Sequence, residues 1–173
     1  MEFIDTELQI KVTFPDDWKV LDNKDIFVDH LDMSIEEASS TDFLLVRDAE
    51  KAEDIRYLTF ASDEGRYPTE SEYNVGLEAN ISFVREHGGE VIARDTTTSD
   101  NGLRLDRIIV KFKDAEIPED EGFLMAQYYA HANNWLVVGA VEIEEEGDEL
   151  DNILQAVVKS MTVTAQPKKE ESK

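Results

Sequence analysis

Polar and apolar residues alternate over several short stretches of the chain, which is the period of half-buried β-strands. Leu8, Ile10, Val12 and Phe14 alternate with polar neighbours, and Pro15 then ends the run because it has no amide hydrogen to donate. Similar stretches, rich in branched and aromatic residues, predict strands at 18–21, 42–48 and 55–62, a hairpin at 90–113 and a second hairpin at 123–143.

Two other segments have the period of amphipathic helices. At 68–89, Thr69 and Glu72 have the spacing of a capping box, and Gly88-Gly89 ends the segment. At 148–161, Asp148 can cap a helix that has one continuous apolar face. The predicted buried positions are Tyr73, Leu77, Ile81 and Val84 in the first segment and Leu150, Ile153, Leu154, Val157, Val158 and Met161 in the second. A shorter helix is predicted after Ser34, three residues before Glu37.

Strands joined by hairpins, together with helices that each need one apolar cover, predict an α+β fold. We expect a three-layer α/β/α sandwich, in which a central, mostly antiparallel sheet of about six strands lies between two long amphipathic helices. Residues 1–164 are expected to form one domain and residues 165–173 a disordered polar tail. The apolar phase shifts between Leu105 and Ile108, which predicts a β-bulge or a change of face near Asp106-Arg107.

Several features of this order resemble the PsbP-like superfamily. They are the strand that ends in Phe14-Pro15 before Trp18, the hairpin glycine Gly102, the stretch "YYAHANNWLVVGA" and Ser160 before the last strand. The similarity covers residues 8–163. It implies an α/β/α sandwich whose better-understood members bind other macromolecules and share no known catalytic site.

The composition narrows the classes of partner. The chain has 40 acidic and 17 basic residues among 173, a formal net charge of −23, and no cysteine. Nucleic acids and anionic membrane surfaces would repel such a protein, whereas a basic protein surface would attract it. No apolar run is long enough to span a bilayer, and the acidic N-terminal stretch does not resemble a signal peptide. A cytoplasmic location is expected, with a removed export leader as the open alternative.

The residue types needed for catalysis or metal binding are scarce. The three histidines are His30, His87 and His131. His87 is expected at a helix end and His131 in a hairpin turn spanning 131–134, both in solvent. His30, between Asp29 and Asp32, is a weak candidate for a metal ligand. We therefore predict no catalytic residues, no metal site and no cofactor.

Other sequence motifs for ligand binding or catalysis are also absent. No phosphate-binding glycine loop and no nucleophile elbow occurs, and the acidic runs lack the ligand spacing of a calcium loop.

The aromatic and acidic residues of the second hairpin are the candidate partner-binding site. Tyr128 and Tyr129 are consecutive in a strand and must point to opposite faces, so one of them is either exposed or lies under a helix on the second face. An aromatic groove framed by carboxylates would be a binding surface. The candidate residues are Tyr128, Tyr129, Trp135, Glu119, Asp120, Glu121, Glu144, Glu145 and Glu146.

These observations favour a non-enzymatic binding or adaptor domain that presents an acidic surface to a protein partner, a basic one being the natural complement. It is expected to be a monomer or a weak dimer. One alternative is a chaperone or accessory factor that holds a client in an apolar groove of the sheet. A second alternative is a hydrolase that depends on carboxylates or a metal.

Overall fold

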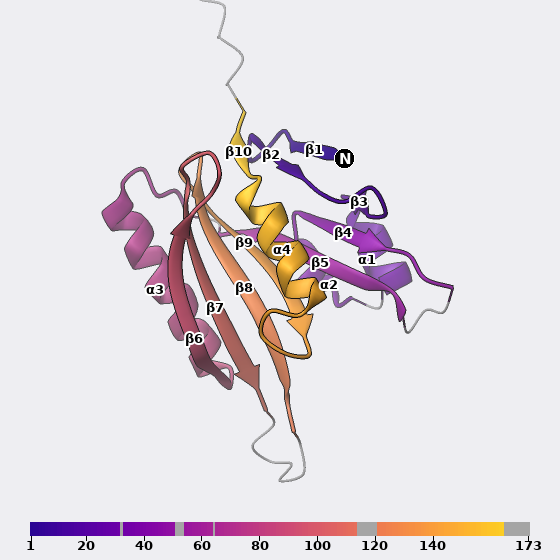
Figure 1. Cartoon of the computed structure of the whole chain (residues 1–173). Coiled ribbons are helices and arrows are strands. Elements are labelled where there is room, and N and C mark those ends of the chain that lie inside the picture. Colours follow the sequence, from indigo (N-terminus) through magenta and orange to yellow (C-terminus); the bar gives the residue numbers. More distant parts are fainter. Residues whose placement is uncertain (32, 51–53, 64, 114–120, 165–173) are drawn as a thin grey trace, which may run out of the picture.

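The computed structural model of the chain describes residues 1–31, 33–50, 54–63, 65–113 and 121–164 (Figure 1). The strands in these ranges are β1 (Glu2–Asp5), β2 (Ile10–Thr13), β3 (Lys19–Leu21), β4 (Phe43–Arg47), β5 (Arg56–Ser62), β6 (Gly89–Thr98), β7 (Arg104–Phe112), β8 (Phe123–Ala132), β9 (Trp135–Ile143) and β10 (Thr162–Val163). The helices are α1 (Lys24–Leu31), α2 (Ile35–Ser40), α3 (Glu70–Glu86) and α4 (Glu149–Lys159).

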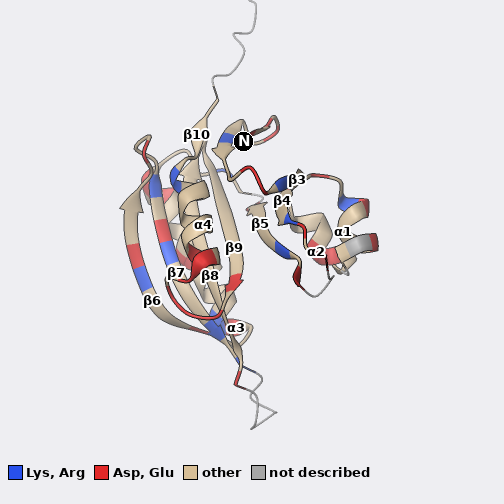
Figure 2. Ribbon diagram, turned by 45° about the vertical axis from the view of Figure 1, so that its right-hand side comes forward, with Lys and Arg blue, Asp and Glu red and all other residues tan. Residues whose placement is uncertain are grey.

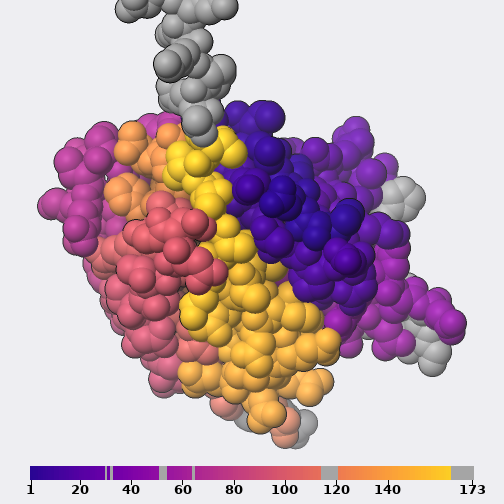
Figure 3. Space-filling model, turned by 45° about the horizontal axis from the view of Figure 1, so that its top comes forward, coloured from indigo at the N-terminus to yellow at the C-terminus, as the bar shows by residue number. Residues whose placement is uncertain are grey.

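The described strands form two antiparallel sheets. The larger has seven strands in the order β3-β4-β5-β9-β8-β7-β6, and the smaller has the order β1-β2-β10. Because β10 pairs with β2, the segment after α4 lies beside the N-terminal strands. Figure 3 shows the N-terminal segment packed alongside α4 on one face of the molecule.

Both faces of the large sheet are covered, but by different kinds of structure. On one face, α4 and the small sheet bury a core that includes Trp18, Phe60 and Tyr128. On the other face, α3 covers one half of the sheet around Tyr129, and α1 and α2 cover β4 around Phe27.

The prediction of a three-layer α/β/α sandwich with two long helices is wrong. The protein is mostly β-structure, with ten strands in two sheets and four helices of 8, 6, 17 and 11 residues within the described ranges. The difference arises because the first two strands pair with each other outside the main sheet, and β2 also pairs with β10. Long-range pairing of this kind leaves no local pattern in the sequence.

The helix ends follow the capping residues of the sequence. Thr69 and Glu72 form a reciprocal capping box at α3, Ser34 accepts from the amide of Glu37 at α2, and Asp148 accepts from that of Asp151 at α4. The predicted stripe of α3 is buried, as are four of the six positions predicted after Asp148. These local predictions are confirmed.

Strand β7 shows why the phase of its apolar residues shifts. Its register with β6 is continuous at Asp106 and Arg107, and the shift lies between Val91 and Ala93 of β6, so the predicted bulge position is wrong. Both charged residues are buried, Asp106 on the α3 face and Arg107 on the α4 face, because β7 is covered on both sides.

Each buried charge in β7 has a full set of partners. Asp106 accepts hydrogen bonds from the hydroxyls of Tyr73 (3.2 Å) and Thr96 (2.7 Å) and from Arg104 (3.0 Å). Arg107 donates to Asp151 (2.8 Å) and to the hydroxyl of Tyr128 (2.9 Å). Buried ions are tolerated only when they are paired in this way.

Asp42, immediately before β4, is less well compensated. Burial raises the pKa of its carboxyl above the ordinary value of 3.8, although a hydrogen bond from Ser62 opposes the shift, and its Oδ2 has no hydrogen-bond partner in the described structure. The folded state therefore binds the proton more tightly than the unfolded state. Stability is expected to fall as the pH rises from 3.8 through the raised pKa.

Asp42→Asn is expected to increase the free energy of unfolding at pH 7 and to lose this advantage below pH 3.8, where the native aspartate is protonated. Urea unfolding over a pH series measures the effect. Asp22→Asn is the matched control, because it removes the same charge from an exposed position. An equal gain in both variants would mean that relief of net charge, rather than burial, is the cause.

Candidate functional site

The aromatic residues predicted to bind a partner are parts of the core. Tyr128 and Tyr129 are 1% and 2% exposed and lie on opposite faces of the sheet, Tyr129 on the face that α3 covers. The alternative in which the second tyrosine lies under a helix is therefore the one observed. Trp135 is half-buried, with the Arg66 guanidinium 3.5 Å from its ring centroid. None of these three side chains lines the cleft described below.

The predicted acidic residues divide between two loops. Glu119 and Asp120 lie outside the described residues. Glu121 is exposed just before β8, and Glu144, Glu145 and Glu146 are exposed between β9 and α4. In Figure 2 the acidic residues of this second loop continue into the start of α4.

The histidines show no catalytic or metal-binding arrangement in the residues described. His87 is exposed at the end of α3, as predicted. His131 lies in β8 and stacks on Tyr73 at 4.7 Å, so the prediction of a solvated turn residue is wrong. The turn is only Asn133-Asn134, whose φ angles of 51° and 62° fit a tight two-residue hairpin.

The predictions about metal can be tested only in part. Asp32 and the side chain of His30 lie outside the described part of the structure, so the predicted weak metal ligand is not tested. The described residues contain no group of three His, Asp or Glu side chains placed to hold a metal ion.

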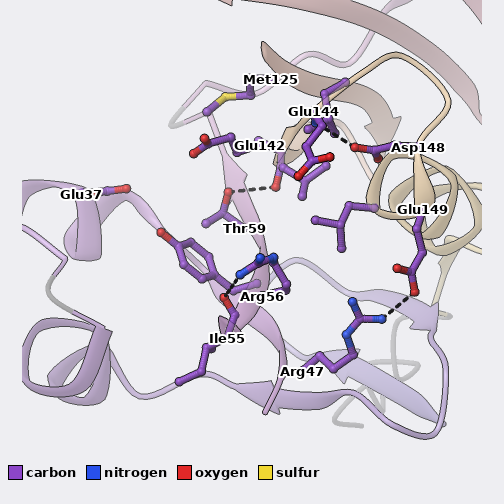
Figure 4. Close-up of a pocket in the computed structure, with 15 residues that line it drawn as sticks. Glu37, Arg47, Ile55, Arg56, Thr59, Met125, Glu142, Glu144, Asp148 and Glu149 are labelled. Atoms are coloured by element: carbon purple, nitrogen blue, oxygen red, sulfur yellow. Dashed lines mark hydrogen bonds and ion pairs between the residues drawn. The ribbon is translucent and has the colours of Figure 1, made fainter. Parts of the chain in front are cut away.

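A cleft of about 710 Å³ lies where β5 and β9 separate (Figure 4). It is lined by Glu37 of α2, Arg47 of β4, residues 55–57 and 59, Met125 of β8, residues 140–144 and residues 148–150. We call it the strand-edge cleft. Of the predicted binding residues that the structure describes, only Glu144 lines it.

The cleft exists because two strands stop pairing before they end. β5 and β9 are paired from Thr59 with Ala140 to Ser62 with Val137, yet each strand continues for three residues beyond Thr59 and Ala140. Over that continuation β5 stays paired with β4, and β9 stays paired with β8. The seven-stranded sheet therefore divides into two parts that diverge at the cleft.

The lining residues show that the cleft passes between strand edges. Side chains of consecutive strand residues point to opposite faces. A cavity lined by Val141, Glu142 and Ile143 in succession, and by Arg56 and Tyr57, must lie against the edges of β9 and β5. It therefore opens toward both faces of the sheet.

The mouth on the α2 face is lined by an aromatic ring and two carboxylates. Tyr57, 41% exposed, has its pKa raised first by burial and then by the charges of Glu37 and Glu142. Glu37 belongs to α2 and Glu142 to β9, and neither carboxylate forms an ion pair within the described residues. Such an arrangement attracts a cation, which the ring face and the carboxylates can hold together.

The mouth on the α4 face carries charges of both signs. Arg47 donates to Glu149 at 2.7 Å (Figure 4) and lowers the pKa of that carboxyl. The Arg47 guanidinium also lies 5.2 Å from the ring centroid of Trp18. Asp148 accepts from the amides of Asp151 and Glu144. In total, five carboxylates and two arginines line the cleft.

Reasoning from the sequence missed Tyr57, Glu37 and Glu142, the residues at the centre of this site. The one sequence feature that pointed to this site is Glu142, a charged residue in the otherwise apolar stretch 135–143. Their proximity depends on where β5 and β9 diverge, which no local pattern encodes.

Comparisons with known proteins add no assignment. No family model matches the chain, and no curated protein matches it. The resemblance to the PsbP-like superfamily stays a prediction. None of the helices within the described ranges is long and apolar enough to cross a lipid bilayer.

Proposed function

We propose that this protein is a non-enzymatic binding module that takes a basic segment of a partner protein into the strand-edge cleft. The observation that carries the proposal is that Tyr57, Glu37 and Glu142 line the same cleft of about 710 Å³, with both carboxylate charges acting on the tyrosine. That volume lies within the usual range for binding clefts of roughly 300–1,000 Å³. The acidic composition supports the same sign of partner, because a net charge of −23 steers basic surfaces toward the protein.

A labelled heptapeptide in which valine alternates with lysine is the probe, and the same peptide with glutamate in place of lysine is its control. Fluorescence anisotropy is expected to detect binding of the lysine peptide only. Glu37→Gln/Glu142→Gln should weaken that binding about tenfold or more, because both charges act at one mouth of the cleft.

The matched control is Glu86→Gln/Glu90→Gln, which removes two exposed carboxylates that do not line the cleft. Its net charge equals that of Glu37→Gln/Glu142→Gln. It should change the affinity by less than about twofold. Equal losses in the two variants would contradict the proposal, since the peptide would then sense only net charge.

Salt separates this proposal from a client held in an apolar groove. Charge pairing weakens as ionic strength increases, whereas apolar burial does not. Raising salt from about 0.05 to 0.5 M is therefore expected to weaken peptide binding severalfold. Binding that is insensitive to salt would favour the apolar alternative.

A further inference from the structure

We infer that the strand-edge cleft binds its partner as an extended strand, held by main-chain hydrogen bonds to the exposed edges of β9 and β5. This inference rests on the proposed function and specifies the conformation and side-chain pattern of the bound segment. It follows from the directions of the backbone groups along the two strands.

A hydrogen bond just beyond the end of the β5–β9 pairing that lies away from the cleft shows which backbone groups point toward the neighbouring strand. Asp63 directly follows β5, and Leu136 belongs to β9. The amide of Asp63 donates to the carbonyl of Leu136. In an antiparallel ladder, alternate residues direct both N–H and C=O toward the same neighbour. The odd-numbered residues of β5 and the even-numbered residues of β9 therefore face each other.

Two independent hydrogen bonds agree with this assignment. The hydroxyl of Thr59 donates to the carbonyl of Ala140 across the same gap, and the carbonyl of Phe60 accepts from the amide of Asp42 on the opposite, β4 side.

Continued past the last pair, the alternation places the N–H and C=O of Tyr57 and of Glu142 along the cleft. Their strands no longer pair with each other there. Glu144 is the next even-numbered residue after Glu142. Its amide donates to the side chain of Asp148, so the exposed edge of β9 ends at Glu142. A peptide strand can bond to such an edge, with its alternate side chains giving specificity.

The side chains at the same positions select the residue pattern of that strand. Tyr57 and Glu142 point to the α2 face, where Glu37 also lies, so a residue of the bound segment that points to this face meets an aromatic ring and two carboxylates. Lysine or arginine fits there. Its neighbours in sequence point to the opposite face, where apolar side chains can pack on Leu150 and Ile143 beside the ion pair of Arg47 with Glu149. The expected ligand is an extended segment with alternating basic and apolar residues.

Backbone N-methylation tests the inference, because it removes amide donors without changing the side chains or the charge. The valine–lysine heptapeptide is compared with two analogues, one methylated at its lysine amides and the other at its valine amides. At least one analogue is expected to bind about tenfold or more weakly. Hydrogen exchange should show slowed exchange at the amides of Tyr57 and Glu142 in the complex with the unmethylated peptide, and little change at Val141, whose main chain faces β8.

The outcomes distinguish the two levels of the proposal. If both methylated peptides bind as well as the parent and Glu37→Gln/Glu142→Gln still weakens all three, strand addition is wrong while recognition of a basic segment stands. If the parent peptide binds wild type and Glu37→Gln/Glu142→Gln equally well, the proposed function fails and the inference fails with it.

Discussion

Replacing Arg107 by leucine is expected to lower the free energy of unfolding by about 3–5 kcal/mol, the usual loss when one partner of a buried ion pair is removed. The Arg107 side chain is 10% exposed and that of its partner Asp151 is 2% exposed. Leucine would leave the Asp151 carboxylate with the hydroxyl of Tyr128 and the amide of Gly147, but with no opposite charge. Urea unfolding followed by circular dichroism measures the loss.

Two further variants show whether the buried charge causes this loss. Asp95→Asn removes a carboxylate that is 57% exposed and 3.3 Å from Arg107, and it should cost less than about 1 kcal/mol. Arg107→Leu/Asp151→Asn removes both buried charges and should recover part of the loss of the single variant. If the free energy of unfolding of the double variant were lower still than that of Arg107→Leu, an uncompensated charge would not be the cause.

The same network affects the candidate site, because it holds the loop before α4. Arg107 donates to Glu146 at 3.0 Å, and the amide of Gly147 donates to Asp151 at 2.8 Å. This loop leads directly to Asp148 and Glu149, which line the strand-edge cleft. Folded Arg107→Leu protein should therefore bind the lysine peptide less well, even though Arg107 does not line the cleft.

The parts of the fold that could be predicted are those determined by neighbouring residues. The capping box of α3 needs only Thr69 and Glu72, three positions apart, and the proline that ends the first long alternation acts on its own strand. The last strand, expected after Ser160, is present as β10. For the helix cap and the proline, the effect lies within one turn or one strand, whereas β10 depends on its pairing with β2.

The parts that could not be predicted depend on residues far apart in the chain. Nothing near Ile10 indicates that its strand pairs with Val163, more than 150 positions away, in a second sheet. Arg107 was a charged residue in an apolar strand and was interpreted as a change of phase. Its burial becomes intelligible only with Asp151, Tyr128 and Glu146 around it.

The candidate site illustrates the same limit. The aromatic pair Tyr128-Tyr129 drew attention because it breaks the alternation of one face, yet a sheet covered on both sides buries both rings. Tyr57 occupies an ordinary strand position, and it is exposed because β9 diverges from β5 beside it. A cleft created by the divergence of two strands has no motif of its own.

Trp18→Ala is expected to lower the free energy of unfolding by about 3–5 kcal/mol, as for other fully buried aromatic residues. Trp18 is 1% exposed, packs in the core beneath α4 and the small sheet, and follows a turn in which its amide donates to the carbonyl of Pro15 at 3.1 Å. Alanine would leave a cavity in the core and would also remove the ring beside the Arg47 guanidinium, so the cleft would lose one support of its α4-face mouth.

Asp16→Asn/Asp17→Asn is the control for this prediction, because these neighbours in the same turn are exposed. Asp16 accepts from the N-terminal amine at 3.1 Å, but its side chain is 93% exposed, so the pair contributes little. The double variant should stay within about 0.5–1 kcal/mol of wild type in urea unfolding. Trp18→Phe should fall between the two, since it keeps most of the buried ring and removes the indole N–H, which has no hydrogen-bond partner in the described structure. If the aspartate variant were as unstable as Trp18→Ala, the turn itself, rather than the buried indole, would be what stabilises this end of the fold.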